Sequence, residues 1–143
     1  MSATPFTFRM AQPITFEHVD PAGWVFYPRY ALFVNAAVEL AFGEGLGWPW
    51  DRMHFEERLG VPTVDLQMRF RKPTRLSEVL DVTLRCEQVG TSSVTLVVDM
   101  RVAGEASPRV EARVVLVHVA LGDPPGKRPW PAPVAARLRG EPA

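Results

Sequence analysis

The sequence is poor in the residues that build disulfide frameworks and metal sites. It contains a single cysteine, Cys86, and only three histidines in 143 residues. One cysteine cannot form an internal disulfide, and the spacing of the histidines matches no metal-binding pattern. We therefore expect no disulfide and no metal, and a reducing, cytoplasmic environment.

The chain also lacks an excess of charge and a long apolar run. Its 16 basic residues balance its 16 acidic residues, so no overall field attracts it to nucleic acid. No stretch of about 18 apolar residues is present, as a membrane-spanning helix would need, and residues 1–6 lack the pattern of a secretion signal. We expect neither nucleic acid nor a membrane as partner.

The length and the proline distribution predict one domain and a tail. A chain of 143 residues is long enough for one core and too short for two. Five prolines gather between residues 124 and 133, which is typical of a stiff surface segment. We predict a single domain over residues 1–121 and a proline-rich tail over residues 122–143. This tail includes one short helix at 133–138 and has no catalytic role.

Apolar spacing predicts one long helix and several strands. Apolar residues recur with helical spacing from Tyr30 to Ala41, after a bent strand over residues 6–18. A two-residue period predicts further strands at 64–71, 80–87, 94–102 and 110–121. The fold class is therefore α+β. One long central helix is wrapped by a curved antiparallel sheet of five to six strands, with the last four strands as a meander.

One helix can cover only one face of the predicted sheet, but apolar residues occur on both faces. Val97 and Val115 lie on the sheet face that points away from the predicted helix. Apolar surface of this kind normally marks an interface. We expect at least a homodimer, joined through edge strands into one continuous sheet.

The segment from His18 to Tyr30 carries the unusual residues of the chain. It precedes the predicted helix, where the first backbone N–H groups lack helical partners and the helix dipole is positive. Those amides can polarise a thioester carbonyl. Pro28 has no N–H, so the donor is Tyr27 or Arg29, and geometry favours Tyr27. Asp20 is the nearby carboxylate and can attack the carbonyl or take a proton from water. An aspartate before a helix is also an ordinary turn or cap residue.

The same segment resembles a known family. Asp20-Pro-Ala-Gly-Trp-Val-Phe-Tyr-Pro-Arg-Tyr30 is similar to the 4-hydroxybenzoyl-CoA thioesterase family of hotdog proteins, in the branch whose catalytic aspartate precedes the central helix. Further matches lie at 45–50 and 60–64. The resemblance implies hydrolysis of an acyl-CoA, with Asp20 as nucleophile or base and the Tyr27 N–H on the thioester oxygen. It also implies a homodimer or homotetramer with sites at the subunit interface, and no cofactor beyond the coenzyme A of the substrate.

The resemblance also suggests the substrate. Relatives of broader specificity often have histidine after the residue that matches Tyr27, whereas this chain has Pro28, as the aromatic-acyl branch does. We expect an aromatic, hydroxybenzoyl-type acyl group or a short one. The expected substrate contacts are His18, Gly23, Trp24, Pro28 and Tyr30.

Binding of the nucleotide phosphates has a weaker basis. The turn at 88–93, which is basic in the aromatic-acyl relatives, has no lysine or arginine here. Arg69, Arg71 and Lys72 are the substitutes that we consider, and a solvated strand face explains these residues equally well.

Several alternatives remain open. Glu39 lies on the helix, where another thioesterase branch has its carboxylate, but we expect it on the polar side. His18 is interpreted first as a hydrogen-bonded structural residue, and Cys86 as a buried, inert thiol. The competing function is a non-catalytic module that binds an acyl thioester or an aromatic ligand in the same cleft.

Overall fold

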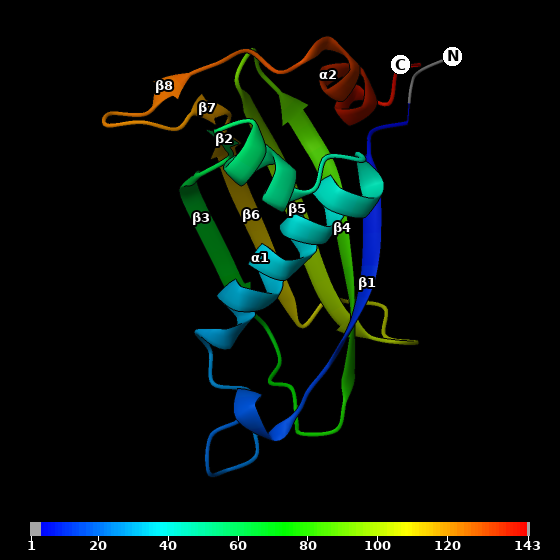
Figure 1. Cartoon of the computed structure of the whole chain (residues 1–143). Coiled ribbons are helices and arrows are strands. Elements are labelled where there is room, and N and C mark those ends of the chain that lie inside the picture. The colour runs from blue at the N-terminus through cyan, green and yellow to red at the C-terminus, as the bar shows by residue number, and fades with distance from the viewer. Residues whose placement is uncertain (1–3, 143) are drawn as a thin grey trace.

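One long helix, α1, lies across the face of a curved antiparallel sheet (Figure 1). A computed structural model describes residues 4–142. It confirms the predicted α+β class with one central helix. The α-helices and strands are, in chain order, β1 (Thr7–Pro13), α1 (Arg29–Leu40), β2 (Leu59–Gly60), β3 (Thr63–Phe70), β4 (Val79–Val89), β5 (Ser93–Val102), β6 (Val110–Val117), β7 (Val119–Ala120), β8 (Gly126–Lys127) and α2 (Ala132–Arg139).

The main sheet has the strand order β1-β4-β5-β6-β3, and all of its pairs are antiparallel. The predicted meander is correct for β4, β5 and β6, but the expectation that β3 continues it is wrong. β1 pairs with the outer side of β4, so β3 crosses to the far edge and pairs with β6. Strands β2, β7 and β8 form a second, small sheet.

The core lies between α1 and the sheet. Alternate residues of β4, β5 and β6 are buried, as their two-residue period predicts. From the helix, Phe33, Val34 and Ala37 pack against them, each at most 3% exposed. Fully burying a valine, leucine or phenylalanine side chain contributes about 1.5–3 kcal/mol, so this helix-to-sheet contact stabilises the fold. After Leu40 the helix continues into a π-helical turn, Ala41–Gly45.

The strand expected over residues 6–18 is shorter than predicted. It ends at Pro13, and Phe16–His18 form a 3-10 turn. Phe16 is 82% exposed, so it does not face the core together with His18 as the alternation predicted. Proline cannot donate to the ladder, and beyond it the Ile14 amide donates to the Glu78 carbonyl oxygen at 2.9 Å as the chain turns away from the sheet.

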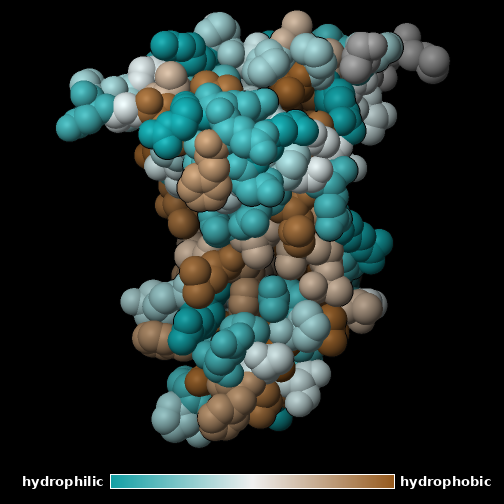
Figure 2. Space-filling view, in the orientation of Figure 1, coloured by the Kyte–Doolittle hydropathy of each residue, from teal (hydrophilic) through white to brown (hydrophobic). Residues whose placement is uncertain are grey.

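Strand β3 carries apolar side chains that the chain itself leaves uncovered. Val64 is 60% exposed, Leu66 41% and Phe70 49%. We predicted one buried face for this strand, which is wrong for the single chain. β3 is the edge of the sheet, and α1 covers it only in part, for example where the Tyr30 ring lies 5.6 Å from the Phe70 ring. Figure 2 shows apolar surface at the narrow middle of the molecule on the side of α1.

The proline-rich segment after residue 121 packs more closely than a surface tail. It forms α2, and Trp130 and Leu138 are 6% and 1% exposed within the core. The Trp130 indole N–H donates to the Ser93 carbonyl oxygen at 2.9 Å, and its ring stacks on His118. Trp130 stands alone among prolines and has no apolar period, so its burial could not be predicted from the sequence.

Candidate active site

Residues 18–26, called the Asp20 loop below, form a short two-stranded ribbon at the end of the molecule where α1 begins (Figure 1). Val19 and Val25 form an antiparallel bridge. The Asp20 amide donates to the Trp24 carbonyl oxygen at 2.8 Å. The turn closes at Gly23, whose φ of +87° favours glycine. The Asp-Pro-Ala-Gly sequence therefore builds a defined turn.

The two oxygens of the Asp20 carboxylate have different surroundings. Its Oδ1 accepts hydrogen bonds from the Ala22 amide at 2.9 Å and the Trp24 amide at 3.3 Å. Within residues 4–142, no group donates to its Oδ2. The interpretation as a turn residue is correct for one oxygen, and the second oxygen is left for a ligand or a water.

The Tyr27 amide is the unpaired donor at the start of α1. The first amides of the helix, which we expected to lack helical partners, bond instead to residues that precede the helix. The Arg29 amide donates to the Phe26 oxygen at 2.9 Å, and the Tyr30 amide donates to the Tyr27 oxygen at 3.1 Å. The Phe26 amide donates to the His18 oxygen at 2.9 Å. In the described part of the chain the Tyr27 N–H has no acceptor, so of the two donors that we considered only Tyr27 is free.

Four of the five predicted substrate contacts have roles within the fold. The His18 Nδ1 accepts the Thr15 amide hydrogen at 2.9 Å, which fits a structural histidine. The Arg75 guanidinium lies over the Trp24 ring, 4.4 Å from its centroid. Tyr30 is 3% exposed and its hydroxyl donates to Thr74 Oγ1 at 3.1 Å. Gly23 belongs to the turn, and Pro28 is exposed just before α1.

The candidate phosphate-binding residues lie at the surface near the end of β3. Arg71 pairs with Glu111 at 3.0 Å, and Lys72 pairs with Glu105 at 3.2 Å. Arg69 is exposed on the same strand. Two of the three cations are thus engaged with carboxylates of the protein.

An apolar groove of about 550 Å³ runs beside α1. Its walls come from α1, from residues 60–63, from β3 and β6, and from the end of β7. The polar side chains in its lining are Asn35, His54 and Thr63, and Trp50 also contributes. Neither Asp20 nor Tyr27 lines it. Its size and lining suit a small, largely apolar group.

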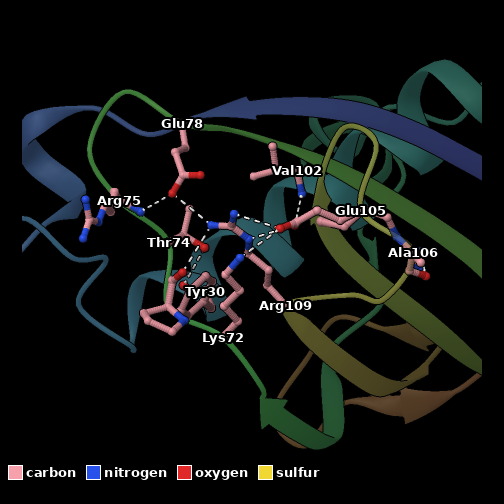
Figure 3. A network of polar contacts seen from close by, with 11 residues as sticks. Tyr30, Lys72, Thr74, Arg75, Glu78, Val102, Glu105, Ala106 and Arg109 are labelled. Carbon is pink, nitrogen blue, oxygen red and sulfur yellow. Dashed lines mark hydrogen bonds and ion pairs between the residues drawn. The ribbon is translucent and has the colours of Figure 1, made fainter.

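Sequence reasoning missed an ionic cluster around the buried Arg109, which lies near the Asp20 loop and is shown in Figure 3. Arg109, 6% exposed, donates to Glu78 Oε1 at 2.9 Å and forms a two-pronged pair with Glu105 at 2.8 and 3.0 Å. Arg109 begins an apolar strand, and a charged residue at such a border is ordinary. No sequence signal identified the cluster.

The pairing shifts the titration of this cluster. Hydrogen bonds from the Arg109 guanidinium, then from the Val102 amide, lower the pKa of Glu105 to about 2. The same guanidinium lowers the pKa of Glu78, and its two carboxylates raise the pKa of Arg109. The cluster is therefore fully charged at neutral pH.

Glu105 is expected to stabilise the fold in a pH-dependent way. A carboxyl whose pKa is lower in the folded protein contributes fully above its unfolded pKa, and this contribution is lost as the pH falls toward the folded value. The melting temperature of the wild type should exceed that of Glu105→Gln by a constant amount above about pH 5. The difference should shrink from the ordinary pKa of 4.5 down toward about 2. Thermal melts of both proteins at pH 3 to 7 measure it, and a difference that is the same at all pH values would contradict the expectation.

Two other titratable residues considered from the sequence, Cys86 and Glu39, do not form a competing centre. Burial raises the pKa of the Cys86 thiol to about 11, so it stays protonated at neutral pH. Glu39 is exposed on α1. Residues 4–142 contain no cluster of three or more histidine, cysteine or acidic residues that would hold a metal ion. In the same range, no helix is long and apolar enough to span a bilayer.

Solved structures share this fold. A thioesterase-superfamily protein from Jannaschia sp. CCS1 superposes with a TM-score of 0.83 at 23% identity, covering 100% of this chain and 99% of the other. The 1,4-dihydroxy-2-naphthoyl-CoA thioesterase from Synechocystis gives 0.82 at 20% identity, covering 92% and 95%. The 4-hydroxybenzoyl CoA thioesterase from Pseudomonas sp. strain CBS-3 gives 0.79 at 24% identity, covering 90% and 96%. At these identities the likeness establishes the fold.

The family follows from the sequence itself. A search of curated proteins gave no match. The family model of the thioesterase-like superfamily matches residues 14–138, which include the Asp20 loop, α1 and every strand of the main sheet except β1. This match confirms the resemblance drawn from the segment around Asp20. The chain belongs to the thioesterase-like superfamily and has the hotdog fold.

Proposed function

We propose that this protein hydrolyses acyl-CoA thioesters, with an aromatic or short acyl group. One observation carries the proposal. The unpaired Tyr27 N–H lies just before the long helix, and the loop directly before it bears the Asp20 carboxylate, which has a free oxygen. A thioester carbonyl needs such a donor and such an oxygen to react.

The proposed chemistry uses these two groups. The Tyr27 N–H donates to the thioester oxygen and stabilises the negative charge that develops there. Asp20 Oδ2 then acts by one of two routes. It attacks the carbonyl carbon, expels CoA as thiolate and forms a mixed anhydride that water cleaves, or it takes a proton from a water that attacks directly. Both routes yield the free acid and CoA.

A homodimer would complete the site. Antiparallel pairing of two β3 edges would cover Val64 and Leu66 and set two α1 helices side by side in opposite directions. The Asp20 loop of one copy would then approach the far part of the apolar groove on the other, near Trp50 and His54. In this arrangement the groove receives the acyl group and the carboxylate comes from the second copy.

The substrate class rests on three supports. The groove is apolar with few polar side chains, as a small aromatic group requires. Pro28 follows Tyr27, as it does in the aromatic-acyl branch. Two proteins of the same fold are named for aromatic acyl-CoA substrates.

The direct test is release of free CoA from a panel of acyl-CoAs. Hydroxybenzoyl-type and benzoyl substrates should be cleaved with higher kcat/KM than straight-chain acyl groups of similar carbon number. The panel should include one aromatic acyl group on an acyl carrier protein. Saturable binding of every member without release of free thiol would instead support the non-catalytic module.

The dimer has its own test on β3. Val64→Asp places a charge on the exposed apolar edge at a residue that does not line the groove, so it should favour the monomer in light scattering at micromolar concentration and lower kcat/KM with it. Val79→Asp is the matched control, because Val79 is also exposed, at 47%, but lies at the start of β4 away from the β3 edge. A Val64→Asp protein that keeps the mass and activity of the wild type would exclude β3 from the interface.

A further inference from the structure

The segment Pro73–Glu78 joins β3 to β4 and supports the Asp20 loop from behind. The Val25 amide donates to the Thr74 carbonyl oxygen at 2.9 Å, and the Leu76 amide donates to the Gly23 carbonyl oxygen at 3.0 Å. Thr74 is completely buried. The far strand of the loop, opposite Asp20, therefore takes its position from this segment.

Arg109 holds the segment at both of its ends. One guanidinium nitrogen, Nη1, donates to the Pro73 carbonyl oxygen at 3.2 Å and to Glu78 Oε1 at 2.9 Å (Figure 3). The same Glu78 oxygen accepts the Arg75 amide hydrogen at 2.8 Å. Arg109 thus bridges the entry and the exit of the turn that carries Thr74.

Glu105 fixes the direction of the guanidinium from the opposite side. It accepts from the Arg109 Nε and Nη2 at 2.8 and 3.0 Å, and from the Val102 amide at 3.0 Å. A planar guanidinium with a two-pronged carboxylate partner has one orientation. A lysine in this place would keep the charge and lose that geometry.

A further contact extends the same support to α1. The Tyr30 hydroxyl, from the first turn of the helix, donates to Thr74 Oγ1 at 3.1 Å. Tyr30 lies three residues after the free Tyr27 amide. Thr74 therefore contacts the Asp20 loop through its carbonyl oxygen and the start of α1 through its hydroxyl, so one residue links both halves of the candidate site.

Stability alone is a weak explanation for this arrangement. Buried ion pairs often stabilise a fold no more than apolar residues of the same size. Here, however, the bonds of Arg109 reach the segment on which the Asp20 loop rests. We infer that Arg109 is a positioning residue, which fixes the Asp20 loop relative to the Tyr27 amide through the Pro73 carbonyl, Glu78 and Thr74. The inference rests on the proposed thioester hydrolysis.

The test begins with Arg109→Lys and Arg109→Met, assayed for CoA release. A small displacement of reacting groups costs up to about 10²-fold in rate. We expect kcat to fall at least about tenfold in both variants, with a smaller change in KM. Glu78→Gln keeps an acceptor for the Arg75 amide, so we expect a smaller loss there. Val94→Ala, a core truncation in β5 distant from the cluster, is the control for lowered melting temperature. A Val94→Ala protein that loses as much kcat for the same loss of melting temperature would overturn the inference.

A double-mutant cycle separates positioning from general damage. If Arg109 acts through Asp20, Arg109→Met should change the residual rate of Asp20→Asn by less than about twofold. An equal fold-loss in both backgrounds would overturn the positioning role.

Hydrogen exchange gives a readout without activity: the Val25 and Phe26 amides should exchange faster in Arg109→Met than in Val94→Ala. Unchanged exchange at these amides would refute the coupling. An Asp20→Asn protein with full activity would refute the proposed hydrolysis instead, while the exchange result would still report on Arg109.

Discussion

Replacing Asp20 by asparagine should lower kcat by about 10²- to 10⁴-fold. The amide oxygen of asparagine can still accept hydrogen bonds from the Ala22 and Trp24 amides, as Asp20 Oδ1 does. The turn is therefore expected to persist. The second position then carries a neutral group that neither attacks a carbonyl nor takes a proton from water. Steady-state CoA release at saturating substrate measures the loss.

The matched control is Glu17→Gln, which neutralises an exposed carboxylate of the same segment. This variant should stay within a few-fold of the wild type. An Asp20→Asn protein with similar activity would show that Asp20 has no catalytic role. Rapid quenching and intact-mass measurement separate the two routes, because only nucleophilic attack leaves the acyl group bound to the protein.

Removing the N–H at position 27 should lower kcat by about 10²- to 10³-fold, the usual cost of losing one donor to an oxyanion. Tyr27→Pro does this with a natural residue. In residues 4–142 the Tyr27 amide has no acceptor, so proline breaks no backbone hydrogen bond. Melting temperature and kcat, measured together, show whether rate is lost while the fold is kept.

Two further variants make this test specific. Tyr27→Phe keeps the N–H and loses only an exposed hydroxyl, so it should remain nearly fully active. Tyrosine replaced by its α-hydroxy acid exchanges the N–H for an oxygen and keeps the side chain, so it should reproduce the loss seen with proline. Full activity in this ester variant would assign the donor to another group.

The parts of the fold that have a strict period were predictable from the sequence. Helix α1 and the strands from β4 to β6 bury one stripe or one face each, and burial of that kind leaves a regular apolar pattern. The place of β3 was not predictable. Its alternation shows that one face is apolar, but it does not identify the strand that pairs with it or the part of the protein that covers the face. The burial of Trp130 escaped prediction since a single side chain has no period.

The candidate site was predictable to a different extent. Asp20 and Tyr27 were chosen from helix-end physics and from a family resemblance, and their catalytic roles stay predictions. The Arg109 cluster was not predicted, because Glu78 reaches the local Glu105–Arg109 pair only through the pairing of strands. Long-range ionic contacts of this type depend on topology, which local patterns do not contain.

The divided carboxylate of Asp20 has a consequence for chemical tolerance at this position. Two backbone amides donate hydrogen bonds to one carboxylate oxygen, so the turn fixes the direction of the other oxygen. A glutamate carries the same charge on a side chain longer by one methylene group. It would either lose the two amide hydrogen bonds or place its free oxygen away from the thioester carbonyl. Activity should therefore depend on the length of the side chain at position 20 as strongly as on its charge.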